Sequence, residues 1–203
     1  MAGRITLTAI VDEAFALLDD AGIDGLTLRA LAGRLGVKAP ALYWHVASKQ
    51  ALIDEMGTEI ARRIAVAVDD APPTDDFAEA LRHTATTMRA EYLRHRDGAR
   101  TFSGTRLSDP ALMRGQEDAL GKWTARGMTV EQVVDAFEIV TAFVVGFVIE
   151  EQERADESRY AVADRDEAVG EEYPLAVAAG HHLLRSAEQR FAEQLALVTR
   201  AFG

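Results

Sequence analysis

Apolar residues recur every three or four positions along most of the chain, and no segment shows the alternation typical of a half-buried strand. The breaks in this pattern fall at glycines and prolines, and a threonine, serine or aspartate precedes several of the apolar segments. We therefore expect an all-α protein. The expected helices cover about residues 7–22, 28–35, 40–46, 49–70, 75–94, 109–127 and 130–153, followed by a last helix from 174 or 181 to 202.

Two segments interrupt the helical pattern. Residues 97–104 form a short connection between two expected helices. Residues 151–172 hold twelve acidic or basic side chains in twenty-two and show no periodicity. The second segment is expected to be an exposed irregular loop or a loosely packed helix.

Residues 27–46 have the length and the turn residues of a helix-turn-helix unit. A helix capped by Thr27 is followed by a turn at Gly36 and by a short helix that begins at Pro40. This arrangement leaves the second helix free to enter a DNA major groove about 12 Å wide. The residues expected to pack the two helices together are Leu31, Leu35, Leu42 and Val46. The alternative is a small structural three-helix unit whose basic face is a coincidence.

The charge of the chain is unevenly distributed. The formal net charge is −11, yet residues 1–53 hold five basic and five acidic residues. No Asp or Glu occurs between residues 25 and 53, and the basic residues of that window are Arg29, Arg34, Lys38 and Lys49. Such a window can bind a polyanion while the remaining, acidic part of the protein repels one.

Composition excludes several classes of protein. The chain has no cysteine, which rules out disulfide scaffolds, thiolate metal sites and cysteine nucleophiles. The longest apolar run, at 139–149, is shorter than the roughly 20 residues that cross a bilayer, and the N-terminus lacks the apolar region of a signal peptide. We therefore expect a soluble, cytoplasmic protein that does not bind membranes.

Short motifs in both halves of the chain point to one family. The first half carries Leu-Gly-Val at 35–37, Pro40, Leu-Tyr-Trp-His-Val at 42–46, and Lys49 followed by Leu52. The second half carries His-Arg-Asp-Gly-Ala at 95–99, Gly-Thr-Arg at 104–106 and the stretch 146–152. With these motifs the chain resembles the tetracycline-repressor (TetR) family, and within it the subgroup of the tetracycline repressor itself. The resemblance implies a helix-turn-helix DNA-binding domain at 1–49 and a ligand-binding and dimerisation domain at 50–203.

The resemblance also implies which residues contact DNA. Thr27 and Arg29 are expected to meet a phosphate or a base edge at the start of the first helix of the motif. Ala39 and Ala41 stand where the tetracycline repressor has polar side chains, so they can make only apolar contacts, and Arg29 becomes the candidate reader of guanine. The full set of candidate DNA-binding residues is Thr27, Arg29, Lys38, Ala39, Pro40, Ala41, Tyr43, Trp44, His45 and Lys49.

The expected helices at 130–153 and 181–202 favour a homodimer. The first is apolar on nearly all sides, which one small core can hardly cover. The second carries an apolar seam at helical spacing, formed by Leu184, Ala187, Phe191, Leu195, Val198 and Phe202. Two such helices from each chain would make a symmetric four-helix interface, and the twofold pair would read a palindromic operator in double-stranded DNA. Packing within a single chain is the alternative use of this seam.

The family resemblance places a pocket for a small-molecule effector between the helices expected at 50–70, 75–94, 109–126 and 130–153. Met88, Phe143 and Phe147 can equally be plain core residues. Arg106 needs an anion or an acceptor, which Glu150, from the same or the partner chain, or the ligand itself could supply. The candidate ligand-binding residues are Thr84, Met88, Phe102, Thr105, Arg106, Trp123, Phe143, Phe147 and Glu150.

The chain departs from the tetracycline repressor at positions that contact the drug. Phe102 stands where that repressor has a metal-ligating histidine, and Ala65, Thr84 and Ala119 replace other polar contacts. Because phenylalanine cannot ligate a metal, we expect no metal site, no cofactor and no magnesium–tetracycline chelate, but an aromatic or polyketide-like effector held by apolar walls. The segment 95–98 is expected to rearrange when the effector releases the repressor from DNA, with Gly98 giving it freedom.

Two other functions have some support in the sequence. An enzyme is disfavoured, because His-Arg-Asp at 95–97 lacks the other kinase motifs and His181-His182 with Glu150, Glu151 and Glu153 lacks metal-ligand spacing. We therefore name no catalytic residue. A DNA-binding dimer that responds to no small molecule, or to a protein partner, stays open, and a pocket filled by its own side chains would favour it.

Overall fold

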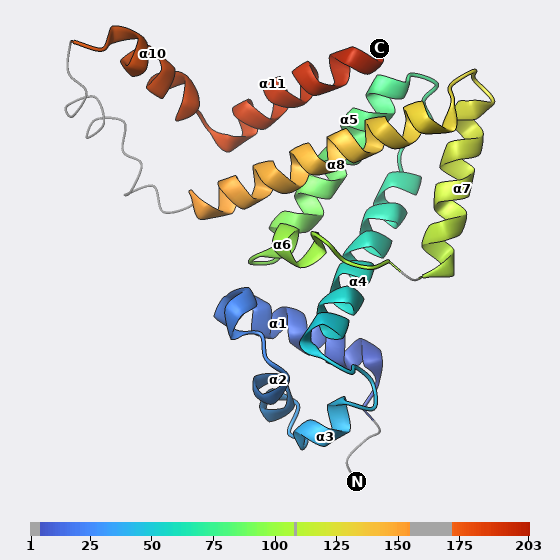
Figure 1. The fold of residues 1–203 in the computed structure, drawn as a ribbon, viewed down its shortest axis with the longest axis vertical. Coiled ribbons are helices and arrows are strands. Elements are labelled where there is room, and N and C mark those ends of the chain that lie inside the picture. The colour runs from blue at the N-terminus through green and yellow to red at the C-terminus, as the bar shows by residue number, and fades with distance from the viewer. Residues whose placement is uncertain (1–4, 108, 155–171) are drawn as a thin grey trace.

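The computed structural model describes residues 5–107, 109–154 and 172–203, and the secondary structure within these ranges is helical, as expected (Figure 1). The N-terminal helices are α1 (Leu7–Gly25), α2 (Leu28–Arg34) and α3 (Ala39–Leu42), and α4 (Lys49–Asp69) follows them. The C-terminal helices are α5 (Phe77–Leu93), α6 (Gly98–Phe102), α7 (Pro110–Thr124), α8 (Val130–Glu153), α10 (Pro174–Leu183) and α11 (Ala187–Thr199), ending in a 3-10 turn at Arg200–Phe202.

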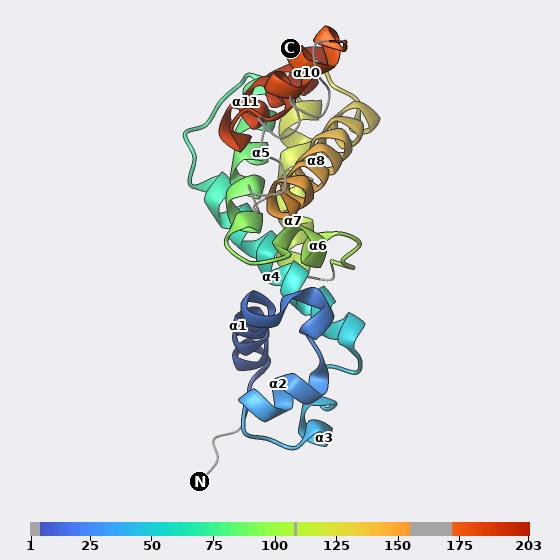
Figure 2. The same ribbon diagram turned by 90° about the vertical axis from the view of Figure 1, so that its left-hand side faces the viewer.

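The first three helices form a small head at one end of the molecule (Figure 2). The starts of α2 and α4 are fixed locally, because the side chains of Thr27 and Ser48 accept hydrogen bonds from backbone N–H groups three residues further on, at 3.1 and 3.0 Å. Gly22 breaks α1 with a φ of 69°, a left-handed conformation that favours glycine. The interior of the head is sealed by fully or almost fully buried side chains, which are Ile10, Leu18, Leu26, Leu31, Leu42 and Val46.

The helix α3 is shorter than the sequence predicted. It ends at Leu42 rather than near Val46, because the N–H groups of His45 and Val46 both turn back to the Leu42 carbonyl, each at 2.9 Å. The turn brings Val46 into the head, where it is 2 % exposed. Tyr43, Trp44 and His45, between Leu42 and Val46, therefore lie on a turn.

The long helix α4 connects the head to the core. It packs on α1 at one end and on α5, α6 and α7 further along (Figures 1 and 2). The centre of the core is the contact between α5 and α8, which α11 covers. Arg89 on α5 ties these helices together, because its guanidinium donates to Glu151 of α8 at 2.7 and 2.9 Å and to Glu188 of α11 at 2.7 Å.

The helix α8 has the predicted limits, and Thr129 begins it with a capping box that Gln132 completes. Among the described helices, it is the one long and apolar enough to cross a membrane by length and composition, and 33 % of its most apolar stretch is buried. The apolar run at 139–149 is shorter than the helix, but the polar residues around it are scattered and leave the mean hydropathy of the helix high. Its contacts with α5, α6, α7 and α11 are those of a core helix.

The prediction of one continuous C-terminal helix is wrong. The helix α10 ends where the Leu184 N–H bonds to the Gly180 carbonyl at 2.9 Å, and Ser186 caps α11 by accepting from the Gln189 N–H at 3.2 Å. Leu184 therefore leaves the predicted seam, while Phe191 and Leu195 of the seam are buried against the core. Of the charged stretch 151–172, Glu151, Gln152 and Glu153 continue α8, and residues 155–171 lie outside the described residues.

Candidate functional site

The face of α3 and its following turn is unusually exposed for a segment with large side chains. Trp44 is 91 % exposed and Tyr43 is 56 % exposed, and Pro40 and His45 also face solvent. Leu42, between them in sequence, is fully buried and anchors the segment. The structure therefore exposes Pro40, Tyr43, Trp44 and His45 on α3 and the turn that follows it, while Ala39 and Ala41 of the same segment are half-buried.

The basic residues of the head divide into bound and unbound groups. Arg34 donates to Glu13 and Asp20 of α1, and these hydrogen bonds raise its pKa above the usual range. Arg29 and Lys38 are exposed, and no hydrogen bond or ion pair joins either side chain to another described residue. The head therefore offers a polyanion fewer free basic side chains than the sequence window suggested, because Glu13 and Asp20 of α1 neutralise Arg34.

Two residues predicted to contact DNA also hold the head together. The Thr27 hydroxyl accepts from the Ala30 N–H as the cap of α2, at 3.1 Å. The Lys49 ammonium donates to the Ile23 carbonyl at 2.6 Å, which pins the start of α4 to the end of α1. An ammonium has three donors, so Lys49 keeps capacity for a phosphate, but its primary contact is within the fold.

The head meets the core at a polar and aromatic joint, formed by the end of α1 and the turn between α5 and α6. The Phe15 ring stacks on the His95 ring with 4.3 Å between centroids. Asp19 accepts from His95 Nδ1 and from the Arg96 N–H, both at 2.9 Å. Asp97, from the same turn, accepts from the Ile23 N–H at 2.9 Å.

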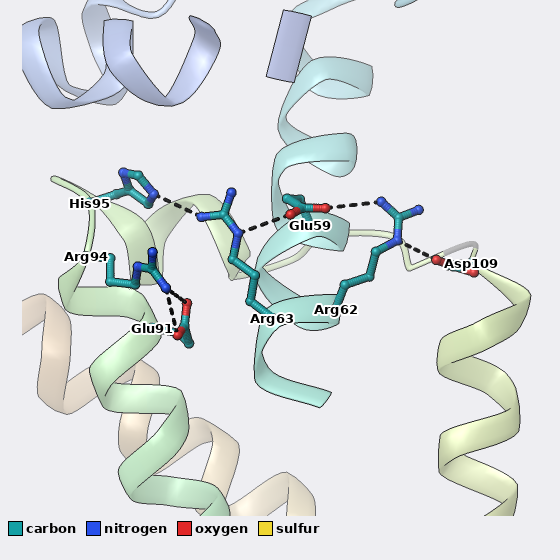
Figure 3. A network of polar contacts seen from close by, with 7 residues as sticks. All are labelled: Glu59, Arg62, Arg63, Glu91, Arg94, His95 and Asp109. Atoms are coloured by element: carbon teal, nitrogen blue, oxygen red, sulfur yellow. Dashed lines mark hydrogen bonds and ion pairs between the residues drawn. The ribbon is translucent and has the colours of Figure 1, made fainter. Parts of the chain in front are cut away.

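A chain of hydrogen bonds and ion pairs extends from this joint across α4 to α7 (Figure 3). Arg63 lies between the His95 ring, 3.3 Å away, and Glu59, to which it donates at 3.1 Å. Glu59 also faces Arg62, which donates to Asp109 at 2.5 Å. Asp109 caps α7, and the Ala111 N–H together with the Arg62 guanidinium holds the pKa of its carboxyl below the usual range. Figure 3 also shows the pair Glu91–Arg94, which lies apart from this chain.

The turn at 95–98 uses its glycine for close packing and not for an unusual backbone angle. Asp97, not Gly98, is the left-handed residue, with a φ of 56°. A Cβ on Gly98 would lie 2.2 Å from the Tyr92 carbonyl oxygen, so the glycine is needed for close packing. Gly98 therefore serves the close packing of α6 on the end of α5, and the expectation that the segment 95–98 rearranges stays a prediction.

Among the described residues, the larger of two neighbouring core cavities lies between α6, α7 and α8. Its volume is about 830 Å³, within the range of pockets that hold drug-sized ligands. Most of its wall is apolar, and Phe102 is the predicted ligand residue that reaches it. The lining residues are Phe102, Ser103, Gly104, Leu107, Gln116, Ala119, Leu120, Val133, Val134, Phe137, Glu138, Thr141, Ala142 and Val145.

A smaller cavity of about 470 Å³ lies between the end of α4, α5 and α7. Thr84 and Trp123, two further predicted ligand residues, line it. Ala119 and Phe137 line both cavities, so these residues form a shared wall. The predicted pocket is thus present as two adjoining compartments.

The other predicted ligand residues have structural roles. Met88 is buried in the core, and Phe143 and Phe147 pack on Phe191 with centroids 5.7 and 5.1 Å away. Thr105 donates to the Thr101 carbonyl at 2.9 Å and lies where a side chain on residue 57 would be. These residues line neither of the two cavities, because their side chains are used in helix packing.

The expected pairing of Arg106 with Glu150 is absent within the described chain. Glu150 accepts instead from Arg154, one helical turn away, at 2.9 Å. The Arg106 side chain is exposed, so it does not need a buried counter-charge. The cavity residues Val134 and Glu138 of α8 were missed, because a helix that is apolar on nearly all sides does not reveal which face borders a cavity. Gln116 of α7 was also missed, since no local pattern marks it.

The donor set of the cavities does not fit a metal ion. Phe102 occupies the larger cavity with a ring that has no ligating atom. Within residues 5–107, 109–154 and 172–203, no group of three His, Asp or Glu side chains is placed to hold a metal. We therefore derive no step that uses one.

Two family descriptions together match most of the chain. "Bacterial regulatory proteins, tetR family" matches residues 10–56, and "Tetracyclin repressor-like, C-terminal domain" matches residues 70–199. The class D tetracycline repressor protein of Escherichia coli is 35 % identical over 203 residues, which cover 98 % of this chain and 89 % of that protein.

Solved structures agree with these matches. A possible TetR family transcriptional regulator from Streptomyces coelicolor A3(2) aligns with a TM-score of 0.83 and 31 % identity, over 97 % of this chain and 98 % of that one. A TetR variant from Acinetobacter baumannii AYE in complex with minocycline aligns with a TM-score of 0.76 and 30 % identity, over 98 % and 93 %. Regulators of this kind are soluble DNA-binding transcription factors and not enzymes. The exposed α3 on a small helical head, the helical core with its cavity, and these matches together place the chain in the TetR family of transcriptional repressors.

Proposed function

We propose that this repressor is a cytoplasmic homodimer that occupies a palindromic operator until an aromatic or polyketide-like effector, bound without a metal ion, releases it. The observation that carries the proposal is the chain of contacts between cavity and head. The helix α7 borders both cavities, its cap Asp109 is bonded to α4, and α4 contacts the head through the joint at His95.

The DNA-binding part of the proposal rests on exposure and charge. Residues 1–49 form the head and residues 50–203 the ligand-binding and dimerisation part. The exposed turn after Pro40 would enter the major groove, where Tyr43 and His45 donate to the backbone. Arg29 and Lys38, which have no acidic partner among the described residues, would supply the charge.

The dimer would form through the helices at 130–153 and 181–202, because apolar surface remains uncovered there. Ile139 on α8 is 50 % exposed and Leu197 on α11 is 60 % exposed. The neighbouring α10 exposes Leu175 and Leu183 as well, and Figure 1 shows this helix extending away from the body. A symmetric partner would bury these surfaces and bring two copies of α3 onto one face of the duplex.

The effector part rests on the larger cavity. Its volume counts against a dimer that responds to no small molecule, since such a protein would fill its core with its own side chains. The structural relative that holds minocycline supports a multi-ring ligand. The absence of a ligating atom on Phe102 favours one that binds without magnesium.

Binding and release can be tested on one operator. A duplex selected from random sequences and labelled for fluorescence anisotropy should bind the protein with a dissociation constant that rises steeply with salt. Aromatic compounds would then be screened in a Trp44→Phe variant, whose remaining Trp123 lines the smaller cavity. Compounds that quench Trp123 should lower operator affinity, and operator should lower theirs by the same factor. Independent affinities, or tight tetracycline binding that requires magnesium, would contradict the proposal.

A further inference from the structure

The larger cavity has an unusual charge composition for a pocket that is mostly apolar. Among the described residues that line it, Glu138 is the one ionisable side chain, and the neutral polar ones are Ser103, Gln116 and Thr141. No lysine, arginine or histidine of the described ranges borders it. An occupant of this cavity therefore meets apolar walls, a few hydrogen-bonding groups and one carboxylate.

The Glu138 carboxylate is available to an occupant. It lies on α8 between Val134 and Thr141, which line the same cavity one turn before and one turn after it. The residue is exposed to solvent, and no hydrogen bond or ion pair joins its side chain to another described residue. The carboxylate can therefore pair with a ligand without first giving up a contact within the protein.

The adjoining smaller cavity has the same sign of charge. Three acidic residues line it, Asp69, Glu79 and Asp118, against Lys122 as the one lysine or arginine among its described lining residues. The Lys122 ammonium is already used, because it donates to the Thr74 carbonyl at 2.7 Å and lies 4.6 Å from the centre of the Trp123 ring. Since Ala119 and Phe137 are common to both cavities, these carboxylates add to the negative potential around the larger one.

These charges discriminate between classes of effector. An aromatic acid would bring a second negative charge next to Glu138, and the nearest expected counter-charge, Arg106, does not line the cavity. A neutral ring system would gain the apolar walls but would leave the carboxylate without a partner. A protonated amine would gain both. The apolar cavity forms the binding site, and the Glu138 carboxylate determines which charge on a ligand is favoured there.

We infer that the effector of this repressor is an organic cation, in which an aromatic body fills the larger cavity and a protonated amine pairs with Glu138. The inference rests on the proposed function, because it names the chemical class of the effector for the same cavity. It adds a specific recognition group, Glu138, to the apolar walls.

Three matched probes test the inference: 9-(aminomethyl)anthracene, 9-anthracenemethanol and 9-anthracenecarboxylate. They share one fluorescent ring system and carry a positive, a neutral and a negative group at neutral pH. Binding to the full-length protein is followed by the anisotropy of the anthracene. Because a partly exposed ion pair contributes up to about 1 kcal/mol, the ammonium probe should bind about fivefold more tightly than the alcohol, and the carboxylate should bind most weakly.

The Glu138→Gln variant should remove the preference, so that the ratio of the ammonium-probe affinity to the alcohol affinity falls from about five to about one. The matched control is Glu117→Gln, on an exposed position of α7 that lines neither cavity; it changes the net charge equally and should keep the preference. Equal binding of all three probes, tighter binding of the carboxylate, or a preference that survives Glu138→Gln would overturn the inference while leaving the aromatic pocket in place. Failure of all three probes to bind would overturn both the inference and the proposed aromatic effector.

Discussion

The joint between head and core can be weakened at one residue without disturbing the interior of either part. Asp19 lies on α1 with a side chain that is 42 % exposed, and it makes two contacts with the turn between α5 and α6. The Asp19 carboxylate accepts from His95 Nδ1 and from the Arg96 N–H, both at 2.9 Å. Asp19→Ala removes both contacts and leaves the stacking of Phe15 on His95 intact.

The size of the effect follows from the exposure of these groups. A partly exposed ion pair contributes about 0.2–1 kcal/mol, and a hydrogen bond that leaves its donor accessible to water about 0.5–1.5 kcal/mol. The free energy of unfolding should therefore fall by about 1–2 kcal/mol. For a chain of this length, about 1 kcal/mol lowers the thermal midpoint by roughly 2–4 °C.

Thermal unfolding followed by circular dichroism measures this change, with Asp12→Ala as the control. Asp12 is an exposed acid of the same helix that contacts no core residue, so its replacement alters the net charge equally. A double-mutant cycle with His95→Ala should give a coupling of about 0.2–1 kcal/mol. If Asp19→Ala and Asp12→Ala unfold at the same temperature, or if the coupling is zero, the joint does not hold the head as described.

Three further outcomes are expected. Gly98→Ala should destabilise the protein by about 1–3 kcal/mol in urea unfolding, because the new Cβ would overlap the Tyr92 carbonyl; an unchanged midpoint would contradict the close contact. Lys38→Ala should reduce the slope of the logarithm of the operator-binding constant against the logarithm of salt concentration by about one. Lys49→Ala should mainly lower the thermal midpoint, because it removes the bond from Lys49 to the Ile23 carbonyl. The reverse pattern would show that Lys49, and not Lys38, contacts phosphate. The pKa of the Asp109 carboxyl is lowered in the folded state, so its ionisation stabilises the protein above about pH 4, and this contribution is lost as the pH falls through the lowered value. Asp109→Asn should therefore make the decrease of the thermal midpoint in acid less steep. An unchanged steepness would contradict this role of Asp109.

The helix starts could be predicted from the sequence because they depend on neighbouring residues. Thr27, Ser48 and Thr129 each cap a helix by accepting from a backbone N–H three residues further on. A threonine or serine directly before an apolar helical segment is visible in the sequence alone. The break of α1 at Gly22 follows in the same way from the conformational freedom of glycine.

The site was predicted less completely because its contacts join residues far apart in the chain. Lys49 bonds to a carbonyl 26 residues away, and Asp19 meets His95 across 76 residues. No local pattern indicates such partners. The cavity wall on α8 was missed for a related reason, since an apolar helix offers several faces of similar hydrophobicity and only the packing of α7 selects Val134 and Glu138.

Because α4 is one uninterrupted helix, its length determines how far the head moves when the core end of the helix tilts. With 21 residues and a rise of 1.5 Å per residue, the helix is about 31 Å long. A tilt of about 5° at the α7 end would therefore displace the opposite end by roughly 3 Å, which is the length of a hydrogen bond. In a twofold assembly the two ends would swing in opposite directions, so the distance between paired recognition turns would change by about twice that amount.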